Sequence, residues 1–177
     1  MSLSNNITSN KQIEKNIIFR LFYFINFFIK CYYNIKLKNV ENIPTHNKSV
    51  IYISRHSTHN WDIFPGMYLF YNYYKKPIRG IGYKLINLTL PHYKHCGIVI
   101  GNRDNVNELI DNNEIIYILP GGAEESTIGH ENSYKINWIT KSGNYRTGFA
   151  KIAIERNIEI IPVAGENTEE MVFAPII

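Results

Sequence analysis

The sequence is poor in cysteine and has no long run of apolar residues. Its 177 residues include only Cys31 and Cys96, which are far apart and outside any CxxC pattern. This argues against a disulfide framework or a cysteine zinc site and favours a reducing compartment. No uncharged apolar stretch reaches the roughly 20 residues of a typical membrane-spanning helix. With 45% hydrophobic and 19% charged residues, the chain should form one folded domain rather than remain disordered.

The charge and the aromatic content narrow the class of partner only partly. A net charge of +4 fits an anionic partner such as a membrane surface, a phosphate-bearing ligand or nucleic acid. Aromatic residues make up 14% of the chain, and many lie in residues 19–33 and 61–74. This density of aromatic residues suits an apolar ligand or a lipid interface, and it suits a tyrosine-rich core equally well.

The N-terminal part of the chain predicts a tail and then an apolar helix. Residues 1–16 read as a polar tail, and the first 12 lack the features of a secretory signal. Residues 17–46 read as a membrane-proximal helical segment whose apolar stretch is interrupted at Asn26 and flanked by Arg20 and Lys30. This helix should lie in a headgroup layer, as in monotopic or peripheral proteins. A buried helix of the domain and a true span are the alternatives.

Residues 47–177 predict a single α/β domain. Short β-branched runs that end at Gly, Pro or Asn indicate strands at 49–54, 78–83, 97–101, 115–119 and 158–164. Helical spacing of apolar residues indicates helices at 61–74, 105–112 and 147–156, with Asp104 as the N-cap of the second. The alternation predicts a largely parallel or mixed sheet flanked by helices, with ligands beyond the carboxyl ends of its strands.

A polar cluster follows the first predicted strand. It contains His56 and, six positions later, Asp62. An acid that holds one ring nitrogen of a histidine protonated leaves the other nitrogen free to accept a proton. No GxSxG elbow or P-loop accompanies the pair, so the histidine would act on a hydroxyl of the substrate itself. A helix-capping aspartate beside a satisfied histidine is the alternative.

Two further strand ends carry residues suited to binding. The turn after the fourth predicted strand contains Gly121 and Gly122, which let backbone approach a ligand or supply a positive φ. Arg103 stands beyond the third strand, where a guanidinium could hold a phosphate or carboxylate. A plain tight bend and a solvated surface arginine are the alternatives.

Four motifs in this order resemble the glycerolipid acyltransferase superfamily. They are His56…Asp62, Gly97…Arg103, the turn PGGAEES and the strand IEIIPV. The nearest likeness is to the branch of diacylglycerol acyltransferase-like, neutral-lipid enzymes. In that branch the His-to-Asp spacing is one residue longer than the Hx4D of lysophosphatidate enzymes, and a PGG turn with a following Glu replaces FPEGT. The resemblance covers roughly residues 49–173.

The resemblance implies an acyltransferase. His56 would be the general base for an acceptor alcohol, and Asp62 would orient and support it. The alkoxide would attack the thioester of acyl-CoA or acyl-carrier protein, with no metal or redox cofactor and no covalent acyl-enzyme. The family pattern places four more residues in the substrate cleft or acceptor pocket: Arg103, Gly121, Gly122 and Glu125. The implied partners are membrane lipids on the cytoplasmic face rather than nucleic acid.

The sequence departs from the family pattern at the glycine turn. Gly121 stands at the position of the FPEGT carboxylate, and Glu124 stands where many relatives have arginine. Glu124 and Glu125 beside the pocket would repel a phosphomonoester, so a neutral alcohol is the expected acceptor. The chain also ends at Ile177, earlier than the resemblance leads us to expect.

Three alternative functions stay open on the sequence. The first is acylation of a lysophospholipid, and the second is a non-catalytic lipid-binding protein on the same scaffold. The third is a zinc module, in which the paired histidines would supply ligands of the type that zinc takes. The candidate zinc ligands are His56, His59, His92, His95 and Cys96.

Overall fold

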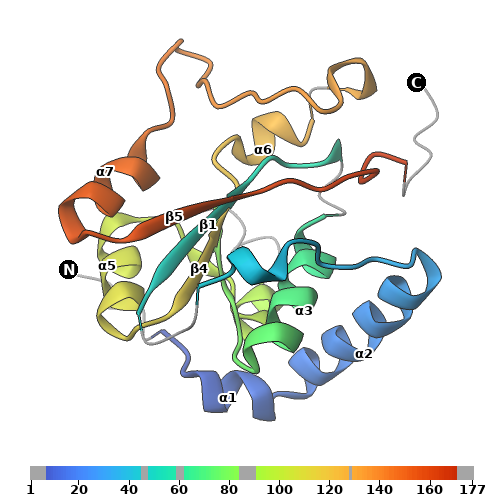
Figure 1. Cartoon of the computed structure of the whole chain (residues 1–177). Coiled ribbons are helices and arrows are strands. Elements are labelled where there is room, and N and C mark those ends of the chain that lie inside the picture. Colours follow the sequence, from blue (N-terminus) through green and yellow to red (C-terminus); the bar gives the residue numbers. More distant parts are fainter. Residues whose placement is uncertain (1–6, 45–47, 59–61, 84–90, 128, 171–177) are drawn as a thin grey trace.

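A parallel five-stranded sheet forms the centre of the molecule (Figure 1). The computed structural model describes residues 7–44, 48–58, 62–83, 91–127 and 129–170. The strands are β1 (Val50–Ser54), β2 (Arg79–Gly82), β3 (Val99–Ile100), β4 (Ile115–Ile118) and β5 (Glu159–Val163). Their order in the sheet is β3-β2-β4-β1-β5, and every pairing is parallel. The predicted α/β class is therefore confirmed, and the sheet is parallel rather than mixed.

The register brings the carboxyl ends of the central strands to one edge. Strand β1 lies between β4 and β5, with Ile53 opposite Ile118 and Ser54 opposite Val163. Loops that leave these strands therefore start beside one another. Because β1 is central, the turn that follows Ser54 begins deep in the molecule rather than at the rim of the sheet.

Helices cover both faces of the sheet because both faces of its strands are apolar. Alternate side chains of β1 point to opposite faces, so Val50 and Tyr52 join one core cluster and Ile51 joins the other. The first cluster packs against α3 (Ile63–Tyr74) and includes Met67 and Phe70. The second packs against α5 (Arg103–Asp111) and α7 (Gly148–Arg156). The short helices are η1 (Val40–Asn42), η3 (Pro91–Cys96), α6 (Gly122–Glu125) and η4 (His130–Asn132).

Two local features differ from the sequence prediction. Helix α1 (Asn10–Lys15) lies within the predicted polar tail, where Ser9 and Gln12 form a reciprocal capping box. Its Ile13 is fully buried, and its Asn10 side chain donates hydrogen bonds of 3.0 and 2.9 Å to the two oxygens of the Glu114 carboxylate, so both contacts hold this short segment on the domain. The N-cap of α5 is Asn102 rather than Asp104, because the Asn102 side chain accepts the hydrogen bond from the Asn105 amide.

Helix α2 (Ile17–Tyr32) has one face on the domain and one face exposed. Its inner face packs aromatic rings edge-to-face against α3, with Phe19 against Tyr71 and Phe22 against Phe64. Its outer face exposes a stripe of large apolar side chains at Ile17, Leu21, Phe24, Phe28 and Tyr32. Within the described part of the chain, every helix is too short or too polar to cross a bilayer.

Candidate active site

His56 lies in the turn directly after β1 and is almost completely buried. Its exposed fraction is 8%, and its ring Nδ1 is buried without a hydrogen-bond partner in the described structure. Burial, with a smaller contribution from the neighbouring Arg55 cation, lowers the pKa of His56 to about 4. The imidazole is therefore neutral at pH 7, with a nitrogen that no other group occupies.

Asp62 precedes α3 and binds the loop, not the imidazole. Its Oδ1 accepts a hydrogen bond of 2.6 Å from the Ser57 hydroxyl, and its own amide donates to that hydroxyl at 3.2 Å. Burial raises the pKa of Asp62, although the hydrogen bonds from Ser57 oppose this. Among the described residues no hydrogen bond joins Asp62 to the His56 ring, so the expected dyad is not closed here. Asp62 occupies the N-cap position of α3, as the alternative expected, but its side chain makes no cap hydrogen bond.

Glu125 fixes the backbone on which His56 is carried. This side chain is 1% exposed, and its Oε2 accepts a hydrogen bond of 2.8 Å from the His56 amide. Its Oε1 accepts a second bond of 2.8 Å from the Asn137 amide. Burial raises the pKa of Glu125, while the two amide bonds lower it. Both oxygens are thus engaged by backbone, so Glu125 joins the two loops and does not line an open acceptor pocket in this structure.

Gly121 is required because Glu125 folds back against it. A Cβ at Gly121 would lie 2.3 Å from Glu125 Oε2 and 2.4 Å from Glu125 Cβ. Gly121 itself has an ordinary helical φ of −65°, so the need is for space and not for conformation. Gly122 differs, because its φ is +57° and the nearest atom to an added Cβ is Arg146 Nη1 at 3.7 Å.

Replacing Gly121 by alanine should destabilise the protein more than the same change at Gly148. The added methyl group would displace the buried Glu125, a steric conflict that typically costs about 1–3 kcal/mol. Gly148 has open space around its missing Cβ and begins α7, so Gly148→Ala should be neutral or stabilising. Urea unfolding of both variants measures the two effects. Equal urea midpoints for the two variants would show that Glu125 can move aside without a loss of stability.

Glu169, which the sequence reading did not identify, holds the same loop from the other side. Its Oε2 accepts a hydrogen bond of 3.0 Å from the Thr58 amide, and its Oε1 pairs with the Arg55 guanidinium. Burial alone would raise the pKa of Glu169, but Arg55 and the Thr58 bonds outweigh it and leave the pKa lowered. Two buried acids from distant segments therefore anchor residues 55–58. Sequence gave no signal for Glu169, because a lone acid after a strand has no characteristic spacing.

Arg103 does not join the group formed by His56, Glu125 and Glu169. Its side chain is 60% exposed and pairs with Glu155, which links α5 to α7. A guanidinium reaches the glycine turn from another segment, because Arg146 pairs with Glu124. The expectation that Arg103 lies in the substrate cleft is thus not supported by its position, and Arg146 is the cation beside the turn.

The histidines considered as zinc ligands do not form a metal-binding group among the described residues. His92 and His95 are on η3 with ring centroids 6.5 Å apart, and His95 Nδ1 is 3.1 Å from the Asn16 amide nitrogen. His59 lies outside the described residues. In the described ranges, no group of three or more His, Cys, Asp or Glu side chains could hold a metal ion.

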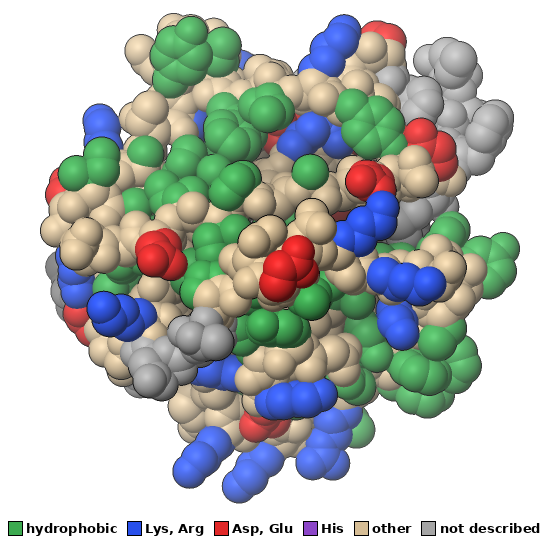
Figure 2. Space-filling model, viewed as in Figure 1, with side chains coloured by type: hydrophobic (Ala, Val, Ile, Leu, Met, Phe, Trp, Pro, Cys, Tyr) green, Lys and Arg blue, Asp and Glu red, His purple; other side chains and the backbone are tan. Residues whose placement is uncertain are grey.

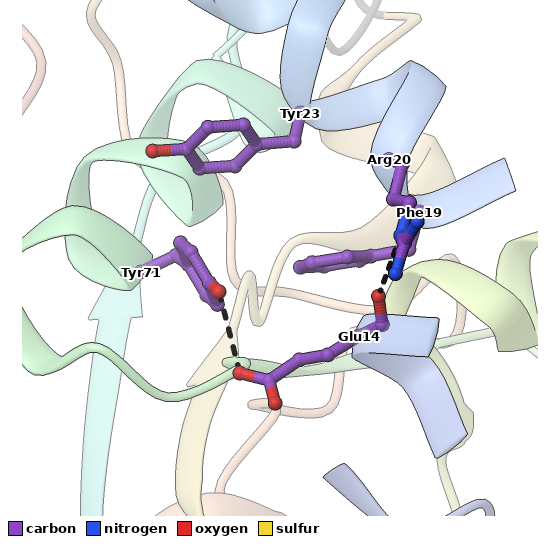
Figure 3. A pocket seen from close by; sticks show the side chains of 5 residues that line it. All are labelled: Glu14, Phe19, Arg20, Tyr23 and Tyr71. Atoms are coloured by element: carbon purple, nitrogen blue, oxygen red, sulfur yellow. Dashed lines mark hydrogen bonds between the residues drawn. The ribbon is translucent and has the colours of Figure 1, made fainter. Parts of the chain in front are cut away.

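A hollow lies between α1, α2 and α3 (Figure 3), and His56 is not among the residues that line it. Tyr71 donates a hydrogen bond of 3.3 Å to the Glu14 carboxylate, and Arg20 Nε donates one of 3.3 Å to the Glu14 carbonyl. Tyr71 lies nine residues after Asp62 on α3, a separation of about 13 Å along the axis. The hollow is lined by Glu14, Phe19, Arg20, Tyr23 and Tyr71.

The burial of His56 should make stability depend on acid pH. The folded protein has a His56 pKa of about 4, below the ordinary value of 6.5. Between these values the unfolded chain binds a proton that the folded chain does not, so stability falls as the pH falls. The loss at His56 is about 3 kcal/mol once the pH reaches 4. Urea unfolding at a series of pH values should show a shallower decline for His56→Gln than for the wild type. If the free energy of unfolding declined equally with falling pH in both proteins, His56 would not be the cause of the decline.

Comparison with known proteins identifies the family. The model of the family described as Acyltransferase matches residues 34–166. A human protein named "DGAT1/2-independent enzyme synthesizing storage lipids" is 34% identical over 70 residues, which are 40% of this chain and 20% of that protein. Bovine and mouse proteins of the same name are 36% identical over 70 residues, which are 40% of this chain and 19% and 20% of those proteins.

The extent of these matches differs between the family and its individual members. The chain spans about a fifth of the length of these curated relatives. No solved structure gives a significant match. The family match, in contrast, contains all five strands together with His56, Asp62 and Glu125. The chain therefore belongs to the acyltransferase family.

Proposed function

We propose that this chain transfers a fatty acyl group from acyl-CoA or acyl-carrier protein to the hydroxyl of a lipid, with a neutral glycerolipid as the preferred acceptor. The observation that carries the proposal is a buried, neutral His56 with an unoccupied ring nitrogen at the carboxyl edge of the sheet. Membership of the acyltransferase family supports the reaction type. The storage-lipid name of three relatives supports a lipid substrate.

In the proposed reaction His56 acts as a general base. The acceptor hydroxyl gives its proton to the imidazole while its oxygen forms a bond to the thioester carbonyl carbon. The tetrahedral intermediate then breaks its carbon–sulfur bond, and the leaving thiolate takes the proton back from the imidazolium. The products are an ester and a free thiol, so no metal or redox cofactor is needed. Burial leaves the ring in its basic form at pH 7, but it also disfavours the imidazolium that forms in this step, which therefore needs a stabilising anion.

Asp62 would support the imidazolium that forms in this step. Ser57 engages Oδ1 of the carboxylate, and the described structure shows no hydrogen bond to Oδ2. A carboxylate in the same turn would stabilise a transient positive charge on the ring, and catalytic contacts often tighten only when substrate is bound. We therefore keep Asp62 in the proposal as an electrostatic and orienting group.

The acceptor class is less constrained by charge than the sequence indicated. Glu125 is engaged by two amides and Glu124 is paired with Arg146, so neither is a free anion beside the turn. A phosphate-bearing acceptor would meet less repulsion than expected, and a lysophospholipid is the second candidate for this reason. The neutral glycerolipid comes first because of the names of the relatives.

Membrane association, as a monotopic or peripheral protein on the cytoplasmic face, belongs to the same proposal. Helix α2 packs one face on α3 and leaves an apolar stripe exposed, which is the pattern of an interfacial helix. Figure 2 shows hydrophobic side chains and basic residues together at the right of the molecule, where Figure 1 draws α2. Membrane lipids and the acyl donor would then be the partners of the chain.

An acyl-transfer assay tests the function directly. The purified chain would be incubated with radiolabelled acyl-CoA and, separately, with diacylglycerol, monoacylglycerol and lysophosphatidate. The proposal expects labelled ester with a neutral acceptor and its loss in His56→Ala. Ester formed only with lysophosphatidate would move the assignment to the second candidate. Bound lipid without turnover on any donor would instead favour a non-catalytic lipid-binding protein.

A further inference from the structure

We propose that residues 134–146, here called the arm, form a second contact with an anionic lipid surface beside His56, separate from α2. The inference rests on the proposed function in one respect, namely that the substrate lies in a membrane. The arm follows η4 and leads into α7, and Figure 1 draws this part of the chain as an extension beyond the sheet.

The outer part of the arm is an ordered hairpin. Ile139 and Tyr145 form an isolated antiparallel bridge, and the Arg146 amide donates to the Trp138 carbonyl at 2.8 Å. The turn closes at Gly143, whose φ of +81° lies in the left-handed region. Trp138 points inward and packs edge-on against Phe149 of α7, with ring centroids 5.7 Å apart. The exposed side chains of the hairpin are therefore held on a fixed support.

The arm is fastened to the His56 loop at several points. The Asn137 amide donates to the Glu125 carboxylate that also binds the His56 amide. Arg55 Nε donates to the Lys135 carbonyl at 3.2 Å, and the Arg55 guanidinium lies 5.4 Å from the centre of the Tyr134 ring. A surface that contacts the arm is thus linked through a few direct contacts to the loop that carries the residue proposed as the base.

The exposed residues of the arm have the composition of a membrane-interface segment. Ile136 is 66% exposed and Tyr145 is 75% exposed. No Asp or Glu occurs between Glu131 and Glu155, whereas Lys135 and Lys141 are exposed in this interval. A surface that carries aromatic, aliphatic and lysine side chains but no acidic ones is suited to bind the headgroup layer of an anionic bilayer. Figure 2 shows hydrophobic side chains at the top of the molecule, where Figure 1 draws the arm.

Vesicle flotation of the full chain tests this contact without any substrate. The vesicles would contain phosphatidylcholine alone or phosphatidylcholine mixed with phosphatidylglycerol. Ile136→Glu should weaken binding to both by at least about tenfold, because it places a charge in the interface. Ile154→Glu on α7 is the matched control, since Ile154 is 82% exposed and lies outside the arm. It should bind like the wild type.

Two lysine variants measure the electrostatic contribution to vesicle binding. Lys141→Gln should weaken binding to the anionic vesicles about fivefold and leave binding to neutral vesicles unchanged. Lys11→Gln on α1 removes an equal charge outside the arm and should have no effect. The proposal is overturned if Ile136→Glu and Ile154→Glu lose equal affinity, if neither loses any, or if Lys141→Gln has no effect on anionic vesicles. A chain that binds vesicles through the arm yet transfers no acyl group would overturn only the proposed function.

Discussion

His56→Ala should lower the turnover number for acyl transfer by about 10²–10⁴-fold, which is the usual contribution of a general base. The substitution removes the only ring proposed to accept the proton of the acceptor hydroxyl. It should not unfold the protein, because the anchoring hydrogen bond is donated to Glu125 by the backbone amide of residue 56 and survives the change. Initial rates with labelled acyl-CoA, at saturating donor and acceptor, measure the loss.

Two control measurements show whether the loss of turnover in His56→Ala comes from the loss of the general base. His95→Ala removes an imidazole that lies on η3 and contacts Asn16, so it should retain the wild-type rate. The wild-type rate should also persist in mild acid, since the base form of His56 predominates above a pKa of about 4. If His56→Ala kept the wild-type turnover number, or if the rate declined with a midpoint near 6.5, another group would be the base.

The fold could be predicted from the sequence because its strands are short β-branched runs with clear boundaries. The runs around Ile51, Ile116 and Ile160 are apolar at consecutive positions, as strands covered on both faces must be. The order of strands could not be predicted, because it depends on which helix crosses which face. Helix α1 was missed for a different reason: its anchors are the burial of Ile13 and the hydrogen bonds from Asn10 to Glu114, and neither gives a local pattern in a polar segment of six residues.

The candidate site was predictable in its residue types and less so in its contacts. The spacing placed His56 and Asp62 in one turn, but it could not show that the Ser57 hydroxyl would bind the Asp62 carboxylate. Glu125 was identified from the glycine turn, yet its contact with a backbone amide depends on how closely α6 approaches the end of β1. Arg103 was the predicted cation of the cleft, but it pairs with Glu155, and the cation beside the glycine turn is Arg146, which the sequence did not single out.

Glu125→Ala should combine a large loss of activity with a clear loss of stability. The alanine leaves the buried amides of His56 and Asn137 without acceptors, and each unsatisfied amide costs about 1–3 kcal/mol. The turn that carries His56 would then shift, and a displacement of about 1 Å at a catalytic group can lower the rate about 10²-fold. Urea unfolding and initial rates on the same preparation measure both effects.

Glu125→Gln makes the role of this residue testable even if the alanine variant folds poorly. The glutamine has nearly the same shape, but it keeps one acceptor oxygen and presents an amide group where the second oxygen was. It should therefore retain more stability than Glu125→Ala while its turnover number still falls below the wild type. The Michaelis constant for the donor should change little, because Glu125 touches backbone and not substrate. If Glu125→Gln had wild-type turnover and a raised Michaelis constant, Glu125 would belong to the substrate pocket and not to the support of His56.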